Sequence, residues 1–267
     1  MEEDKQMKKL AINHAKNLMP DMLYEVGKPS KYFKGRKNEV AAVKESLLKK
    51  RIRSCVLVGK SGVGKTEIVR KAVKELDNKD IVMSLDVGSL IRNCTLVGLL
   101  EERTKTLIKK ILDHNKTYDY KIVLFIDEIH ALFYVGKNDY TGSVSVGELL
   151  KPYLADGRIT IIGATTNEEF KKYILADKAL LRRLPPIFVD SMGDGEILSI
   201  VKEFGGGALT DKQCEMCVEL GKKVSYLQNP DSALEIADRA IAKAMANLRS
   251  VTEEDIALVT KTMTEVM

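Results

Sequence analysis

The sequence lacks any long apolar run, and this absence excludes one class of protein. A transmembrane helix needs about 20 consecutive apolar residues, and no stretch of the 267 residues approaches that length. The first ten residues, MEEDKQMKKL, are charged and contain no apolar core of a secretory signal. We therefore expect a cytoplasmic protein that has no membrane partner.

Cysteine is scarce, and no charge of one sign dominates. A lone C-x-x-C, Cys214 and Cys217, without a second pair or nearby histidines is weak ground for a zinc site. We expect these two residues, with Cys55 and Cys94, to be buried thiols of a reducing cytoplasm. The net charge of +5, from 43 basic and 38 acidic residues, is too small to predict a nucleic-acid-binding face, which needs clustered Lys and Arg.

Strand-like and helix-like segments alternate through the first 190 residues, and only helical patterns follow. Five nearly continuous apolar runs predict strands at 55–59, 81–86, 121–127, 159–164 and 186–189. Such alternation favours βαβ units and a parallel sheet covered by helices on both faces. We expect three parts: an N-terminal helix or arm over 1–30, a large α/β domain over 31–191 and a small helical domain over 192–267.

Start signals mark the helices of the last part. In TEEDIALV, Thr252 is the expected N-cap and Asp255 stands at the third helical position, which is close to a capping box. Asp194 and Asp231 are the expected caps of two earlier helices.

The glycine-rich segment GKSGVGKT gives the strongest chemical signal. It fits G-x-x-x-x-G-K-[ST], follows a predicted strand and opens a predicted helix. Its glycines let the backbone curl around phosphate with the N–H groups inward, and the helix N-terminus adds a positive dipole end. We expect Lys65 to reach the β- and γ-phosphates and Thr66 to hold Mg²⁺. The candidate nucleotide-binding residues of this segment are Gly59, Lys60, Ser61, Gly62, Val63, Gly64, Lys65, Thr66 and Glu67.

The segment VLFIDEIH is an apolar strand that ends in two acids. The end of a strand beside a phosphate loop is where a carboxylate that orients Mg²⁺ belongs. We expect Asp127 to hold the metal, mainly through water, and Glu128 to activate the attacking water. His130, next in line, is interpreted as a structural histidine rather than a catalyst.

Two later segments supply further candidates. In ITIIGATTNEEF, Thr166 follows a strand and could hydrogen-bond the attacking water or the γ-phosphate. In ALLRR, Arg182 and Arg183 suit the charge that develops on a transferring phosphoryl group. If neither arginine reaches its own site, it must serve a neighbouring subunit, and this implies a ring.

Taken together, the motifs resemble the first nucleotide-binding domain of Clp-type AAA+ unfoldases and disaggregases. The resemblance runs from about residue 33 to 265 and rests on Gly35-Arg36, GKSGVGKT, LDVGSL, EERTKTLI, VLFIDEIH, LLKPYLADGRI, GATTNEEFKKYI, ALLRR and NPDSALEIADRA. It implies an α/β P-loop fold, with a five-stranded parallel sheet of order 5-1-4-3-2 flanked by helices and a small helical lid domain. It also implies ATP and Mg²⁺, hydrolysis to ADP and phosphate, and hexameric rings that thread polypeptide.

The resemblance adds residues that the motifs alone do not assign. It places Phe33, Gly35, Arg36 and the lid residues Leu198, Pro230 and Asp231 around the adenine. It also places the pore loop at Leu96 and Val97, where the family has an aromatic residue. Neither residue has the flat ring that would grip a threaded chain. We expect Leu99 and Leu100 to begin the following helix and to face the core.

We therefore expect an ATP-hydrolysing chaperone module of Clp type that assembles into a ring and remodels or unfolds proteins. The alternative is a nucleotide-gated oligomerisation or regulatory module that threads nothing. A third hypothesis is a DNA-associated AAA+ loader, against which the mild charge argues. Salt-dependent DNA binding would revive it.

Overall fold

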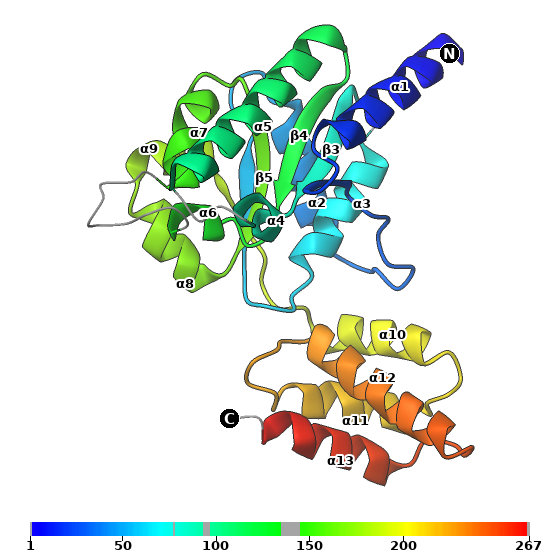
Figure 1. Cartoon of the computed structure of the whole chain (residues 1–267). Coiled ribbons are helices and arrows are strands. Elements are labelled where there is room, and N and C mark those ends of the chain that lie inside the picture. The colour runs from blue at the N-terminus through cyan, green and yellow to red at the C-terminus, as the bar shows by residue number, and fades with distance from the viewer. Residues whose placement is uncertain (1, 77, 93–96, 135–144, 266–267) are drawn as a thin grey trace. The chain divides into compact units, whose positions relative to one another are not determined.

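The computed structural model describes residues 2–76, 78–92, 97–134 and 145–265 (Figure 1). The chain divides into two compact units, one built around a β-sheet and one around helices. The first unit comprises Met1–Lys28, Asn38–Val58 and Val69–Phe188. The second comprises Pro29–Lys37, Gly59–Ile68 and Val189–Met267. No helix within the described ranges is long and apolar enough to cross a membrane.

The sheet of the first unit is mostly parallel. Over the described ranges it has six strands in the order β1-β3-β4-β5-β2-β6. Their bounds, in that order, are Leu23–Glu25, Asp80–Leu85, Lys121–Ile126, Thr160–Thr165, Cys55–Val58 and Pro186–Phe188. The five strands β2 to β6 run parallel to one another. The expected α/β fold with a mostly parallel sheet and flanking helices is therefore confirmed.

Strand β1 corrects the expectation of a five-stranded, purely parallel sheet. It pairs with β3 in the antiparallel direction, with Leu23 opposite Leu85, so the sheet is mixed. Only Leu23 of its three residues is buried, so the segment carries no apolar run. Pro20 and Pro29 stand on either side of it, and prolines are uncommon inside strands, so nothing in the sequence predicts a strand here.

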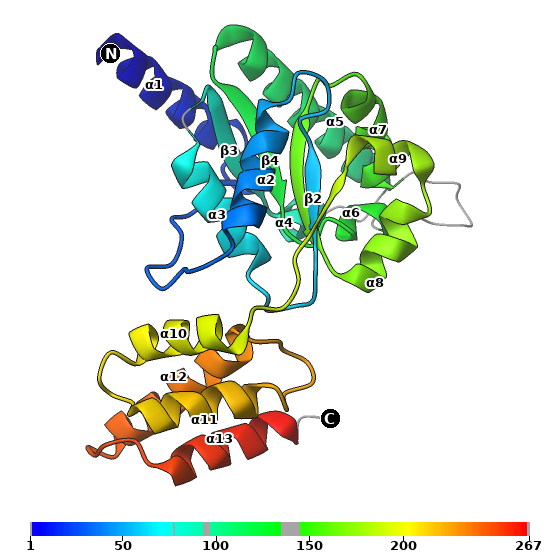
Figure 2. The same ribbon diagram turned by 180° about the vertical axis from the view of Figure 1, so that it is seen from behind.

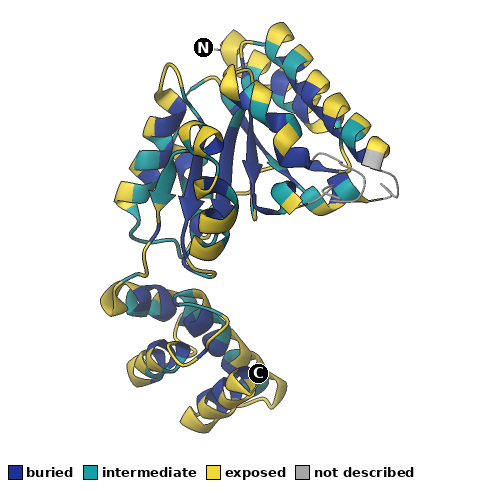
Figure 3. Cartoon of the chain, turned by 90° about the vertical axis from the view of Figure 1, so that its left-hand side faces the viewer, coloured by how far each residue is buried: buried dark blue, intermediate teal, exposed yellow. Residues whose placement is uncertain are grey.

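Helices cover both faces of the sheet. Figure 1 shows α1 and α5 on one face, and Figure 2, from behind, shows α2 and α3 on the other. Strands β2 and β4 are buried along nearly their whole length, because side chains on both faces are covered. Figure 3 shows buried strands in dark blue within the sheet unit. The helices of this unit are α1 (Glu2–Leu18), α2 (Lys37–Leu48), α3 (Lys65–Glu75), α4 (Val87–Ile91), α5 (Val97–Thr117), α6 (Ala131–Tyr134), α7 (Val146–Ala155), α8 (Asn167–Glu169), the π-helical segment η1 (Phe170–Leu175) and α9 (Lys178–Arg183).

The second unit has a core of its own. It is made by α10 (Asp194–Gly205), α11 (Asp211–Gly221), α12 (Asp231–Ala246) and α13 (Glu253–Thr264). Buried aliphatic side chains such as Val201, Val218 and Ile236 meet at the centre of these helices. This apolar core explains why the segment folds as a separate unit.

Of the three N-caps predicted in the second unit, one is observed and two are not. Thr252 caps α13, and its hydroxyl and the Asp255 side chain form the expected capping box. At α10 and α12, however, Asp194 and Asp231 are the first helical residues, and Gly193 and Pro230 precede them as caps. An acid in the first turn still favours a helix start, because it interacts with the positive end of the helix dipole.

The three cysteines within the described ranges are buried thiols. Cys55 lies in β2, and Cys214 and Cys217 lie in the core of the second unit. Burial raises the pKa of the Cys217 thiol to about 12, with the nearby Cys214 as a second cause. Metal ligation requires the thiolate, so this environment disfavours zinc at the C-x-x-C. Cys94 lies outside the described residues.

Candidate functional site

The glycine-rich segment forms a tight loop between β2 and α3. Strand β2 ends at Val58 and α3 begins at Lys65. Gly62 and Gly64 have φ angles of 81° and 94°, which only glycine adopts without strain. A Cβ atom on Gly62 would also lie 2.8 Å from the carbonyl oxygen of Gln228. Glycine is therefore required at position 62 for two independent reasons.

Lys65 is folded back into this loop. Its side chain is only 7% exposed, and its Nζ donates to the carbonyl oxygens of Gly59 and Lys60 at 2.8 and 2.9 Å. Arg36 supports the loop from another segment by donating from Nη2 to the carbonyl oxygen of Val63 at 2.9 Å. The loop thus concentrates positive charge where a helix begins, which is the arrangement that binds phosphate.

An apolar pocket of the second unit adjoins the loop, since Val63 and Gly64 belong to both. Its empty volume is about 410 Å³, which includes space open to solvent. The lining residues are Ser30, Tyr32, Phe33, Lys34, Arg36, Val63, Gly64, Glu67, Met192, Ile200, Pro230 and Leu234. An apolar cleft with a few polar groups is the usual form of a site for a planar organic ring.

The residues expected around the adenine divide into two groups. Phe33, Arg36 and Pro230 line the pocket. Gly35, Leu198 and Asp231 are not among its lining residues. Gly35 has a φ of 66°, and a Cβ there would lie 2.7 Å from an oxygen of Glu196, so it permits a turn.

The two lid residues of that second group have other surroundings. Leu198 packs against the core of the second unit, and Asp231 opens α12 at the surface. Sequence reasoning missed the apolar walls contributed by Met192, Ile200 and Leu234. Ile200 and Leu234 are apolar residues near the first turns of α10 and α12, and that position was the only indication in the sequence that they could line a pocket.

Asp127 and Glu128 follow β4 directly in the first unit. Asp127 is half-buried and Glu128 is exposed. Glu128 has a φ of 52°, a left-handed conformation that is uncommon for a residue with a side chain and often marks functional sites. Its backbone N–H donates to Oδ1 of Asp127 at 3.2 Å. The two acids are therefore held at the carboxyl end of a central strand.

Thr166 lies at the corresponding end of the neighbouring strand β5. It caps α8, and its hydroxyl donates to Oε2 of Glu169 at 2.6 Å. The Glu169 backbone N–H donates in return to the Thr166 hydroxyl at 3.4 Å. Thr166, the candidate for contacting water or phosphate, thus forms a capping box with Glu169.

His130 joins these two strand ends. It is 8% exposed, and its ring nitrogens contact Oε2 of Glu128 at 3.3 Å and Oε1 of Glu169 at 2.9 Å. The interpretation of His130 as a hydrogen-bonded structural histidine fits these contacts. Glu169 was missed, although the T-x-x-E spacing of TTNEE is a capping-box signal. Burial raises the pKa of the Glu169 carboxyl, but hydrogen bonds from Thr166 and the His130 charge outweigh it and lower the pKa.

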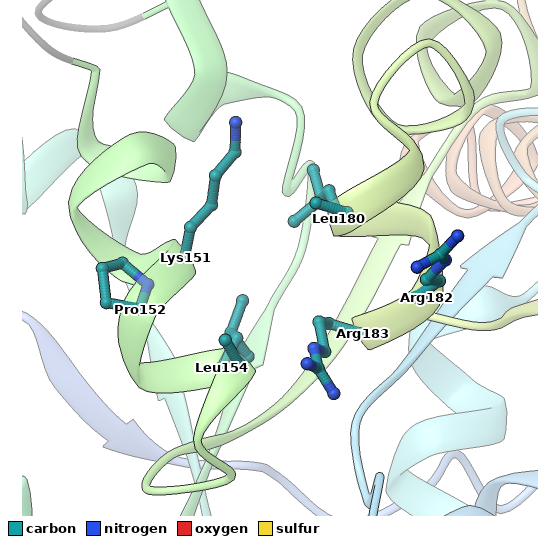
Figure 4. A pocket seen from close by; sticks show the side chains of 8 residues that line it. Lys151, Pro152, Leu154, Leu180, Arg182 and Arg183 are labelled. Carbon is teal, nitrogen blue, oxygen red and sulfur yellow. The ribbon is translucent and has the colours of Figure 1, made fainter.

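The paired arginines lie in the last turn of α9. Figure 4 shows the pocket between α7 and α9, with Arg183 beside it and Arg182 pointing away from α7. Arg182 is exposed and Arg183 is half-buried. Among the described residues, neither guanidinium has a recorded ion pair or hydrogen bond. Within residues 2–76, 78–92, 97–134 and 145–265, nothing therefore occupies these two guanidinium groups.

The expected pore loop is described only in part. Leu96 lies outside the described residues, and Val97 is the first residue of α5. Leu100 faces the core, as expected, but Leu99 is 44% exposed, which corrects the expectation for Leu99. The two residues differ because consecutive positions on a helix point in different directions.

Comparison with known proteins gives the class to which this fold and loop belong. Residues 55–189, about half of the chain, match the family described as ATPase family associated with various cellular activities (AAA). The chain belongs to this family.

Its relatives include chaperones. The chaperone protein ClpB of Aquifex aeolicus is 36% identical over 225 residues, which are 78% of this chain and 22% of that protein. ClpE of Bacillus subtilis, an ATP-binding subunit of the ATP-dependent Clp protease, is 36% identical over 242 residues, or 84% of this chain and 33% of the relative. The chain thus spans about a fifth to a third of the length of such relatives.

Solved structures of Hsp104 are similar over nearly the whole chain. Hsp104 with ATPγS and FITC casein, in a closed state, matches 94% of this chain and 46% of its own, with a TM-score of 0.75 and 25% identity. The S. cerevisiae Hsp104–ADP complex matches 93% of this chain and 45% of its own, with the same TM-score and identity. The fold is therefore that of a Clp-type AAA+ protein.

Proposed function

We propose that this chain is an ATP-binding module of Clp type that hydrolyses ATP to ADP and phosphate. The observation that carries the proposal is the loop around Lys65, where two glycines with positive φ and a buried ammonium stand at a helix start. Chains with this loop bind the phosphates of a nucleotide. The adjoining pocket, which shares Val63 and Gly64 with the loop, would take the adenine.

The proposed roles follow from the chemistry of each side chain. Lys65 binds the β- and γ-phosphates. Thr66 and Asp127 offer the hard oxygen ligands that Mg²⁺ prefers, and the ion, when bound, neutralises charge on the phosphate oxygens. Glu128 accepts the proton of the attacking water, and Thr166 lies at the next strand end to orient water or phosphate.

We propose the AAA+ domain division for the chain: an arm over 1–30, an ATPase domain over 31–191 and a lid over 192–267. Four residues of the 192–267 segment, Met192, Ile200, Pro230 and Leu234, line the pocket, which supports a lid role. Read from the β6 edge, the parallel strands follow as β6, β2, β5, β4 and β3, which supports the order 5-1-4-3-2.

We propose that the module works in a ring, as a homo-oligomeric hexamer or within a larger AAA+ assembly. Arg182 and Arg183 support this, because cationic side chains that pair with no group in the described part of the chain suit the nucleotide of a neighbour. The relatives named as ClpB chaperones support a polypeptide as the substrate that is remodelled. One solved Hsp104 structure contains casein with the nucleotide analogue ATPγS.

A nucleotide-gated regulatory module remains the second candidate. The observation that favours it is the absence of an aromatic residue at positions 96 and 97, where Leu96 and Val97 would give a weaker grip on a threaded chain. Both candidates bind ATP and assemble, and they differ in whether substrate is moved.

Replacement of Glu128 by Gln tests the proposal. The amide keeps the size of the side chain but cannot accept a proton, so we expect ATP binding to persist and hydrolysis to fall by about 10²–10⁴-fold. The measurement is ATP affinity and turnover on one sample whose mass in solution is determined with and without ATP. Unchanged turnover in Glu128→Gln would remove Glu128 from the mechanism, and absence of ATP binding by the wild type would refute the module.

A further inference from the structure

His130 lies between two carboxylates that belong to different strand ends. Glu128 follows β4, and Glu169 ends α8, the short helix after β5. The Glu128 carboxylate faces Nδ1 of the ring at 3.3 Å, and the Glu169 carboxylate faces Nε2 at 2.9 Å. Nδ1 also lies 3.1 Å from the hydroxyl of Thr165. The ring therefore bridges two elements that are separated by about forty residues.

The arrangement suits a chain of hydrogen bonds better than a metal site. The three side chains are close enough to hold an ion. However, the two carboxylates face opposite nitrogens of His130, and one ion bonds only one of these nitrogens. An imidazole with a carboxylate at each nitrogen instead donates to one of them when neutral and to both when protonated.

Glu128 needs support of this kind. Its φ of 52° is a conformation that surrounding structure must enforce in a residue with a Cβ. Its side chain is 55% exposed, whereas that of His130 is 11% exposed. The ring of Tyr173 stacks on that of His130 with centroids 6.3 Å apart and an interplanar angle of 19°. The Glu128 carboxylate, at a largely exposed position, is thus contacted by a packed ring.

Glu169 extends the chain to the candidate residue on β5. Its Oε2 accepts from the Thr166 hydroxyl at 2.6 Å and from the Thr165 hydroxyl at 3.3 Å. Glu128 and Thr166 are therefore connected through His130 and Glu169, with each step a side-chain contact. A displacement of Thr166 by water or phosphate would be transmitted to Glu128 along this route.

We propose that His130 is a positioning residue that, together with Glu169, orients the Glu128 carboxylate for activating water and couples it to Thr166. The proposal rests on the function proposed above, in which Glu128 is the general base. It assigns to His130 a role in turnover beyond packing, while the phosphate loop keeps the role of binding ATP.

Single and double substitutions test the coupling. We expect His130→Ala and Glu169→Gln each to lower kcat by about 10-fold or more while ATP affinity stays within about twofold, because neither residue belongs to the phosphate loop. The double variant should be no slower than the slower single variant, since both break the same connection. His130→Asn, which keeps a donor on the Nδ1 side toward Glu128, should recover part of the lost rate. Glu168→Gln, the same change one residue earlier at an exposed position, is the matched control and should leave kcat unchanged.

A second measurement does not depend on turnover. Amide hydrogen exchange at residues 127–131 should rise in His130→Ala and Glu169→Gln but not in Glu168→Gln, with thermal unfolding confirming that each variant is folded. Wild-type kcat in His130→Ala, or losses that multiply in the double variant, would overturn the positioning role while leaving the ATPase proposal intact. If the wild type binds ATP but does not hydrolyse it, and exchange at 127–131 is the same in all variants, both proposals fail.

Discussion

The phosphate loop and the surroundings of Glu128 are built in opposite ways. In the loop, Lys65 bonds carbonyl oxygens five and six residues before it. Glu128 instead contacts His130, which reaches Thr165 at the end of β5 and Glu169 in α8. The hydrogen bonds of the Lys65 side chain are therefore local, although Arg36 and Gln228 also contact the loop, whereas the proposed hydrolytic site is assembled by the topology of the sheet. Binding and turnover should accordingly fail independently.

The largest effect on ATP turnover among these tests is expected for the arginines, which belong neither to the phosphate loop nor to the surroundings of Glu128. Replacing both Arg182 and Arg183 by Ala should lower ATP turnover by about 10³-fold, as loss of an arginine finger does. Subunits carrying this change, mixed with Lys65→Ala subunits, should regain part of the activity, because an intact loop and intact arginines would meet between neighbours. The measurement is ATPase activity against mixing ratio. No recovery in rings of unchanged mass would place both halves of the site within one chain.

A smaller effect should follow from altering the loop itself. Gly62→Ala must accommodate a φ of 81° and a contact of 2.8 Å with the Gln228 carbonyl oxygen, and a left-handed residue alone costs about 1–2 kcal/mol. We expect ATP affinity to fall about tenfold or more. Gly64→Ala is the matched control, because its φ is 94° but its Cβ would have nothing within 4 Å. Titration of both variants with ATP, at equal thermal stability, measures the difference, and equal losses would show that the close contact is unimportant.

The smallest effect concerns another long-range contact of the first unit. His114 of α5 is fully buried, and its Nδ1 lies 2.9 Å from Nδ1 of His14 in α1. Burial lowers the pKa of His114; the Tyr120 carbonyl opposes this, and His14 and Lys121 add to it. Below about pH 6.5 the unfolded chain takes up a proton that the folded His114 resists, so stability should fall as the solution is acidified.

Denaturant unfolding at pH 7.5 and 5.5 measures this dependence. The loss of unfolding free energy between the two values should be smaller in His114→Gln than in the wild type. The same difference in both proteins would assign the pH dependence to other groups. ATP affinity should not follow this titration if the loop is locally specified.

The contrast between local and long-range structure also explains what could be predicted. The parallel strands could be predicted because each is a short apolar run bounded by turn residues. The capping box at Thr252 could be predicted from the spacing of Thr252 and Asp255. Strand β1 could not be predicted, because three residues with one buried side chain show no apolar periodicity. Glu169 was not predicted as a site residue, because its role depends on a contact with His130, thirty-nine positions away in the sequence. The apolar wall at Ile200 escaped because a buried aliphatic residue looks the same whether it faces a core or a pocket.

The composition of the nucleotide pocket has a consequence for the protein during its synthesis. The loop and one wall lie within the first 68 residues, but Met192, Ile200, Pro230 and Leu234 belong to the last third of the chain. A nascent chain that has emerged as far as β6 has all strands of the sheet unit, and such units fold as they leave the ribosome. The residues of the phosphate loop have then been made, but Gln228, which contacts Gly62, and one wall of the pocket have not. The pocket thus acquires its full set of lining residues only when the chain has been made as far as Leu234, well after the last strand of the sheet.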